Sequence, residues 1–169
     1  MDTQIKLDCF LARGHILDMV ITLESFMDYY ISTRLTKDKM KTFLLSGLIL
    51  TPRVPLESKK QIFFALTELF DPHFQTDKKV SRDFDTIIQT RNTFAHYPLS
   101  EDAEAMAAYE KTGELRFLKF KNVKEANKKD KNAPKETSYV TDIIFTPKDL
   151  KELRQLINEY IKKVQALTK

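Results

Sequence analysis

The chain contains little glycine and almost no cysteine, and each shortage argues against a class of site. Only three of the 169 residues are glycine, which argues against a glycine-rich loop that cradles a phosphate. Cys9 is the single cysteine, so the chain can form neither an internal disulfide nor a zinc site built from several cysteines. We expect no metal site and no cofactor.

Long apolar runs and a strong charge imbalance are also missing. No apolar stretch approaches the roughly 18 residues that a membrane-spanning helix needs. The first residues lack the basic-then-apolar order of a secretion signal. The formal net charge of +4 is compatible with nucleic-acid binding without being evidence for it. These absences predict a soluble, cytoplasmic protein with no membrane partner.

Apolar residues at helical spacing are abundant. The length predicts a single domain over residues 1–169, large enough to bury a core. Gly47 and the segment Thr51–Pro55 are predicted to end the second helix, and Asp71–Pro72 to close the third. On the first helix, the residues expected to face inward are Leu7, Phe10, Leu17, Val20, Ile21, Met27 and Ile31. The periodicity favours helices over residues 2–35, 39–48, 56–70, 78–97, 101–111 and from 147 onward.

The pattern changes at Gly113. Residues 115–120 and 139–145 are rich in β-branched and aromatic residues, which favours two strands of an inserted β-hairpin over residues 113–146. The residues between them, 121–135, are polar and rich in lysine, as in an exposed loop. We therefore predict a mainly α protein, a bundle of four to five helices with a small β-hairpin before the C-terminal helix.

Six consecutive residues near the middle of the chain, 91–96, carry the clearest functional signal, because they place three polar groups at the end of a predicted helix. At about 100° per residue, Arg91 projects near the centre of that helix's apolar stripe. A charged side chain there must be paired, bound to an anion or placed at an interface. Asn92 and His96 are four residues apart and share a neighbouring face. His96 lies in the last turn, where the helix dipole favours a protonated imidazole.

This R-N-x-x-A-H motif resembles the signature of the HEPN superfamily of helical domains, an R-x4-H pattern in which a polar residue commonly follows the arginine. Here Asn92 provides that residue, and Arg91 and His96 have the R-x4-H spacing. The long first helix also fits, so the resemblance covers residues 1–100 and the last helix. The hairpin lies outside the core of the family. The resemblance implies a HEPN-like helical bundle.

Many HEPN domains are metal-independent endoribonucleases that act as dimers, and some are toxins or antiviral defence proteins. The resemblance implies that Arg91 and His96 are the catalytic pair, with Asn92 in support. Imidazole exchanges protons near neutral pH and can act as a general acid or base. A guanidinium can hold a phosphate through its planar fork of donors. Because one helix supplies few groups for this chemistry, we expect a homodimer acting on RNA.

The family also contains toxins that an antitoxin silences by modifying a tyrosine in an R-x4-H-x-Y pattern. In this chain Tyr97 directly follows His96, and Pro98 occupies the next position. The departure puts modification of Tyr97 in doubt, and a neutralising antitoxin partner remains an open expectation.

Other interpretations of the same residues stay open. Glu24 also projects toward the apolar side of its helix, so it can either form a buried ion pair with Arg91 or orient Arg91 as a supporting residue of the site. Lys128, Lys129 and Lys131 belong either to a solvated loop or to an arm that attracts the RNA backbone. The chain as a whole is an endoribonuclease, a non-catalytic HEPN-fold module that binds RNA or protein, or a scaffold in which the motif serves packing.

Overall fold

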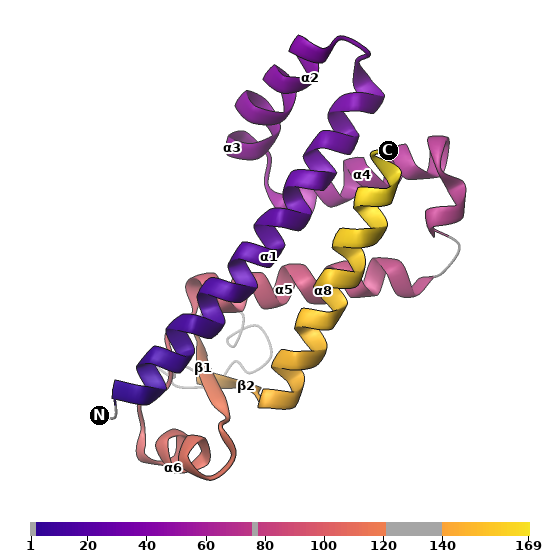
Figure 1. The fold of residues 1–169 in the computed structure, drawn as a ribbon. Coiled ribbons are helices and arrows are strands. Elements are labelled where there is room, and N and C mark those ends of the chain that lie inside the picture. Colours follow the sequence, from indigo (N-terminus) through magenta and orange to yellow (C-terminus); the bar gives the residue numbers. More distant parts are fainter. Residues whose placement is uncertain (1–2, 76–77, 121–139) are drawn as a thin grey trace, which may run out of the picture. The chain divides into compact units, whose positions relative to one another are not determined.

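The computed structural model describes residues 3–75, 78–120 and 140–169, which are mainly helical with one two-stranded antiparallel sheet (Figure 1). The predicted mainly α class, with a small pair of strands before the C-terminal helix, is confirmed. No helix in the described part of the chain has both the length and the apolarity that crossing a membrane requires. The elements are α1 (Thr3–Leu35), α2 (Lys39–Leu44), the π-helical turn η1 (Leu45–Leu50), α3 (Thr51–Arg53), α4 (Leu56–Phe70), the 3-10 turn η2 (Pro72–Gln75), α5 (Lys78–His96), α6 (Ala103–Thr112), β1 (Leu115–Phe120), β2 (Val140–Phe145) and α8 (Pro147–Leu167).

The chain divides into two compact units. Unit 1 comprises Met1–Arg13 and Asn92–Lys151, and unit 2 comprises Gly14–Arg91 and Glu152–Lys169. Three long helices, α1, α5 and α8, contribute residues to both units. The expected single domain over residues 1–169 stays a prediction.

Unit 1 is built around the small sheet. Strand β1 pairs antiparallel with β2, and the register places Leu115 opposite Phe145. The ring of Phe117 on β1 is buried, and its centroid lies 4.9 Å from that of Phe94 on α5 and 5.9 Å from that of Phe145. Aromatic side chains bury a large apolar area each, so this cluster fixes the sheet against the C-terminal turns of α5.

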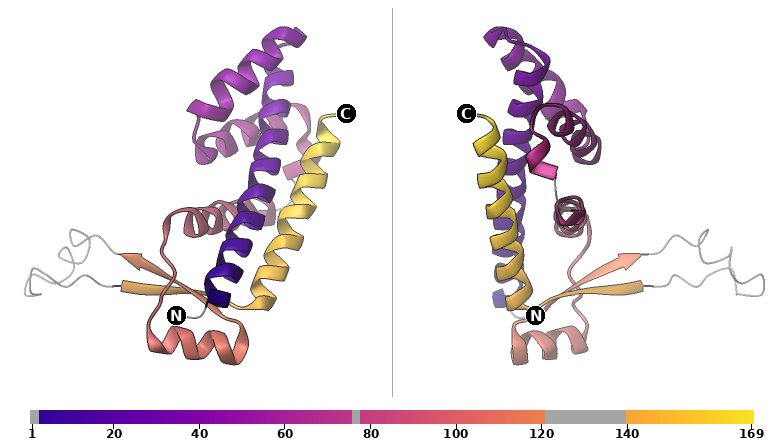
Figure 2. Two further views of the ribbon diagram at one scale, coloured as in Figure 1. Left: turned by 60° about the vertical axis from the view of Figure 1, so that its left-hand side comes forward. Right: turned by 90° about the vertical axis from the view of Figure 1, so that its right-hand side faces the viewer.

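Unit 2 packs four helices around aromatic side chains. The segment of α8 in this unit runs beside the C-terminal part of α1 (Figure 2). Buried rings link the helices in a chain: Tyr30 lies 5.1 Å from Phe63, Phe63 lies 6.0 Å from Phe84, and Phe84 lies 5.0 Å from Tyr160. The hydroxyl of Tyr160 donates a hydrogen bond to Asp83 at 2.8 Å, so its polar end is satisfied. These rings are the core that joins α1, α4, α5 and α8 within unit 2.

The inward face of α1 differs in part from the prediction. Val20, Met27 and Ile31 are buried as expected, but Leu7, Phe10 and Ile21 are 48%, 72% and 60% exposed. Their assignment to the core was wrong, because α1 is apolar on two opposite sides and periodicity alone does not choose between them. The buried side follows a regular helical spacing through Ile5, Cys9, Ala12, Ile16, Val20, Leu23, Met27, Tyr30 and Ile31.

The second predicted helix continues past the point where the sequence indicated a break. Helical backbone runs from α2 through η1 and α3, so it includes both Gly47 and Pro52. Proline has no amide N–H, so a regular α-helix would lose one backbone hydrogen bond at this position. The turn just before it is π-helical and wider, with the amide of Thr51 donating to the carbonyl of Ser46. We attribute the continuation to this local change of helical register.

Replacing Tyr30 with phenylalanine is expected to change stability mainly at high pH. The Tyr30 hydroxyl donates to Asp71 at 2.6 Å. Burial, followed by this hydrogen bond to a carboxylate, raises the pKa of Tyr30 to about 12. The phenol loses its proton near pH 10 in an unfolded chain, so its contribution is complete below about pH 10 and is lost as the pH rises through about 12. Urea unfolding of the wild type should therefore show a steeper fall over this interval than unfolding of Tyr30→Phe. Equal slopes would contradict the assignment.

Candidate functional site

The motif lies on the last turns of α5, and its polar side chains are accessible to different degrees. Asn92 and His96 are exposed and Arg91 is half-buried, whereas Thr93 and Phe94 between them are buried. The helix ends at His96, and the amide of Tyr97 closes the final turn by donating to the carbonyl of Thr93 at 3.0 Å. The helix predicted over residues 78–97 therefore ends one residue earlier than expected.

The spacing of the motif sets how its side chains are distributed around α5. Asn92 and His96 lie about 40° apart around the helix axis, and Arg91 and His96 about 140° apart. The amide and the imidazole therefore share one face of the helix, whereas the guanidinium departs from a different face. Arg91 is assigned to unit 2, and residues 92–96 are assigned to unit 1.

The backbone after His96 is held by the strand β1. The amide of Ser100 donates to the carbonyl of Arg116 at 2.8 Å, and the amide of Leu118 donates to the carbonyl of Pro98 at 2.9 Å. Leu99 forms an isolated antiparallel bridge with Phe117. Through these bonds, the predicted inserted strand fixes the exit from α5, and with it the position of His96 within unit 1.

Arg13 is a residue that the sequence analysis missed. Its guanidinium donates to the carbonyl of Tyr97 at 2.5 Å and lies 5.1 Å from the ring centroid of Phe117. Carbonyl groups in the last turn of a helix and just beyond it have no partner within the helix, and a cationic side chain can satisfy them. Arg13 therefore ties α1 to the end of α5 inside unit 1. Its neighbours Ala12 and Ile16 on α1 are buried, and no local sequence pattern predicts this contact.

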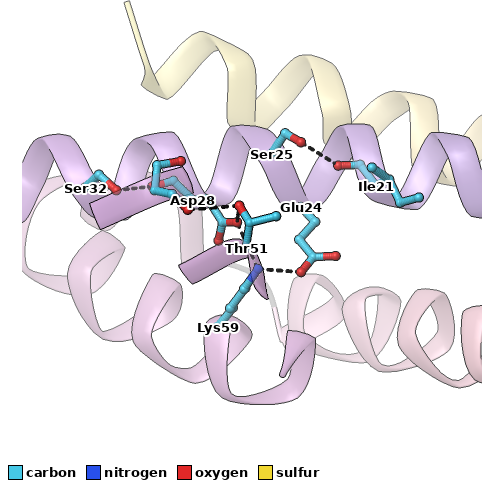
Figure 3. A network of polar contacts seen from close by, with 8 residues as sticks. Ile21, Glu24, Ser25, Asp28, Ser32, Thr51 and Lys59 are labelled. Atoms are coloured by element: carbon cyan, nitrogen blue, oxygen red, sulfur yellow. Dashed lines mark hydrogen bonds and ion pairs between the residues drawn. The ribbon is translucent and has the colours of Figure 1, made fainter. Parts of the chain in front are cut away.

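Glu24 has a partner that the sequence analysis did not predict. The ammonium of Lys59 on α4 contacts the carboxylates of both Glu24 and Asp28 on α1, as Figure 3 shows. The Lys59 side chain is completely buried, and 2.8 Å separates its Nζ from Oδ2 of Asp28. The pairing of Glu24 with Arg91 stays a prediction, because the Glu24 carboxylate contacts Lys59 in the structure.

The ion cluster of Glu24, Asp28 and Lys59 contains one more carboxylate than ammonium. Burial raises the pKa of Asp28, against the lowering effect of Lys59. The hydroxyl of Thr51 lies 3.0 Å from Oδ2 of Asp28, whereas Oδ1 is buried and has no hydrogen-bond partner in the described part of the chain. Buried charges are tolerated when they are paired. The ammonium of Lys59 therefore makes the burial of the Glu24 and Asp28 carboxylates acceptable. The cluster joins α1, α3 and α4 within unit 2.

The structure does not describe every predicted site residue. Lys128, Lys129 and Lys131, proposed as an RNA-binding arm, fall outside the described residues. In the ranges that are described, no group of three or more histidine, cysteine, aspartate and glutamate side chains is placed to hold a metal ion. The chain matches no family model, and neither a curated protein nor a solved structure resembles it significantly.

Proposed function

We propose that this protein is a metal-independent endoribonuclease of the HEPN type, acting as a homodimer through Arg91 and His96. The observation that carries the proposal is the R-N-x-x-A-H motif at the C-terminal end of α5, where Asn92 and His96 are accessible to a ligand. Arg91 is half-buried, so part of this residue is exposed to solvent.

The proposed chemistry uses only proton transfer and charge stabilisation. One imidazole removes the proton of a ribose 2′-hydroxyl, and the 2′-oxygen attacks the adjacent phosphorus. The bond from phosphorus to the 5′-oxygen breaks, and this oxygen receives a proton from a second imidazole. The products are a 2′,3′-cyclic phosphate and a 5′-hydroxyl. Arg91 stabilises the charge that develops on the phosphoryl oxygens.

A second copy of the chain would supply what one α5 lacks. The reaction needs an acid and a base at the same phosphate, and the motif contains a single histidine, His96. Unit 1 carries exposed apolar side chains at Leu7, Phe10 and Leu11 on the first turns of α1. Exposed apolar groups of this size favour contact with another protein surface. A twofold pairing would bring two motifs together.

Purified protein incubated with a mixed-sequence RNA in EDTA is expected to cut the RNA and to leave 2′,3′-cyclic phosphate ends. A phosphatase cannot remove a 2′,3′-cyclic phosphate until its ring has been opened. Resistance before opening and removal afterwards therefore identify these ends. Light scattering during size-exclusion chromatography should give twice the chain mass. Growth arrest on induced expression would indicate a toxin or antiviral role, and rescue by a co-expressed neighbouring gene would reveal an antitoxin.

Absence of cleavage in EDTA would overturn the enzymatic proposal. Salt-dependent RNA binding without cleavage would instead favour the alternative, a non-catalytic RNA-binding module of the same fold, since phosphate contacts weaken steeply as salt rises.

A further inference from the structure

Unit 2 contains a pocket that the proposed ribonuclease activity does not use. It lies between the C-terminal turns of α1 and the segment formed by α2 and η1, which lie side by side in Figure 1. Its volume of about 620 Å³ is within the range of pockets that hold small organic ligands, about 300–1,000 Å³. All its lining residues belong to unit 2.

Two aromatic rings provide the apolar wall of the pocket. Tyr29 comes from α1 and Phe43 from α2, and both are exposed although they line a hollow. Thr33 and Thr42 also line the pocket. Covering such rings with an apolar ligand would remove them from water, which is favourable in proportion to the area buried. The body of the ligand should therefore be apolar.

The charged groups that line the pocket are all positive. They are Lys37 and Lys39, both exposed, and no aspartate or glutamate is among the lining residues. Asp38 lies between them in the sequence, but its Oδ1 accepts the amides of Met40 and Lys41 at 2.9 and 3.1 Å at the start of α2. Oδ1 of Asp38 is thereby bonded to the backbone at the start of α2. The polar end of the ligand should therefore be an anion.

Two of the lining residues have an uncommon backbone conformation. Ser46 and Gly47 belong to the π-helical turn η1, a conformation that recurs at functional sites. The Thr51 hydroxyl lies 2.9 Å from the Ser46 carbonyl and also contacts Asp28, so the buried ion cluster supports this turn. A Cβ atom added at Gly47 would meet no atom within 4 Å, which means that Gly47 faces open space.

We propose that this pocket binds a small amphiphilic anion, a molecule with an apolar chain or ring and a single carboxylate. The apolar part lies against Tyr29 and Phe43, and the carboxylate lies between the ammonium groups of Lys37 and Lys39. This site is independent of the motif on α5, so it does not rest on the ribonuclease proposal.

Calorimetric titration of the full chain with decanoate tests the proposal. Decanoate should bind saturably with one site per chain. Decyltrimethylammonium has the same chain length and the opposite charge, and butyrate has the same charge and a short chain. Each should bind at least about tenfold more weakly, the scale of one charge-assisted or apolar contact. Equal binding of the cation, or no saturable binding of decanoate, would overturn the proposal.

Three variants locate the binding. Lys37→Glu combined with Lys39→Glu should weaken decanoate binding by about tenfold or more, and Phe43→Ala should also weaken it. Because all three side chains are exposed, these variants should keep the fold, which circular dichroism can verify. Gly47→Phe adds a large side chain at a lining position and should change the binding of decanoate. Lys162→Glu changes an exposed lysine on α8 that does not line the pocket, and it should bind as the wild type does. Unchanged binding in the Lys37 and Lys39 double variant would refute the assignment.

Discussion

Lys59→Met is expected to lower the free energy of unfolding by about 3–5 kcal/mol, the cost of leaving buried charge without its partner. The Lys59 side chain is completely buried between two carboxylates, and the side chain of Asp28 is only 1% exposed. Methionine has a similar length and fills the same space, so the loss arises from charge and not from a cavity. Chemical denaturation monitored by circular dichroism measures it.

The pH dependence of this loss distinguishes an electrostatic cause from a packing defect. Burial already raises the pKa of Asp28, and removal of Lys59 takes away the effect that opposes this rise. Protonated Asp28 needs no cation, so the destabilisation caused by Lys59→Met should shrink as the pH falls. A loss that does not depend on pH would point to packing instead.

Two companion variants complete this experiment. Adding Asp28→Leu and Glu24→Gln to Lys59→Met should recover much of the stability, because apolar groups often replace a buried ion pair without loss. Lys6→Met removes a lysine whose ion pair with Glu101 is half-exposed on both sides, and it should cost no more than about 1 kcal/mol. If Lys59→Met is no more destabilising than Lys6→Met, the ion cluster does not stabilise the fold.

His96→Ala is expected to reduce RNA cleavage by about 10²–10⁴-fold, the usual contribution of a general acid or base. The side chain is exposed at the end of α5, so the free energy of unfolding should change by at most about 1 kcal/mol through the helix dipole. Single-turnover cleavage of a labelled RNA measures the effect. Arg91→Lys keeps the positive charge but loses the planar fork of donors, and it should also cleave slowly.

A matched control lies on the same helix. Arg82→Ala removes an exposed cation from α5, two turns or more before the motif, and it should leave cleavage close to that of the wild type. Equal losses in Arg82→Ala and His96→Ala would show that general positive charge, and not the motif, supports the activity. Full activity of His96→Ala would exclude the proposed mechanism.

Apart from the second helix, the helices could be predicted closely because their signals are local. The bounds of α5, from Lys78 to His96, follow from apolar spacing and from the proline at position 98. The start of α8 after Thr146 follows from a cap followed by a proline. These signals act within a few residues of the chain and need no tertiary contact.

The faces of the helices were harder to predict, and α4 illustrates the reason. The apolar residues of α4 include Ile62, Leu69 and Phe70, but all three are exposed. The buried side of α4 instead carries Lys59 and Thr67 around Phe63. A lysine is assigned to the surface by any local rule, and only the carboxylates of α1, more than thirty residues earlier in the chain, make its burial acceptable.

By itself, the sequence predicted most of the helical and extended segments, although not the continuation of the second helix, and it placed Asn92 and His96 on one face at the end of a helix. Those outcomes depend on short-range spacing, capping and proline, which the amino-acid order contains directly. The tertiary structure alone decided which side of α1 is buried, that Glu24 meets Lys59, and that Arg13 holds the backbone after His96. Each of these is a contact between residues distant in the chain, and its stability depends on burial and on partners that only the packed helices bring together.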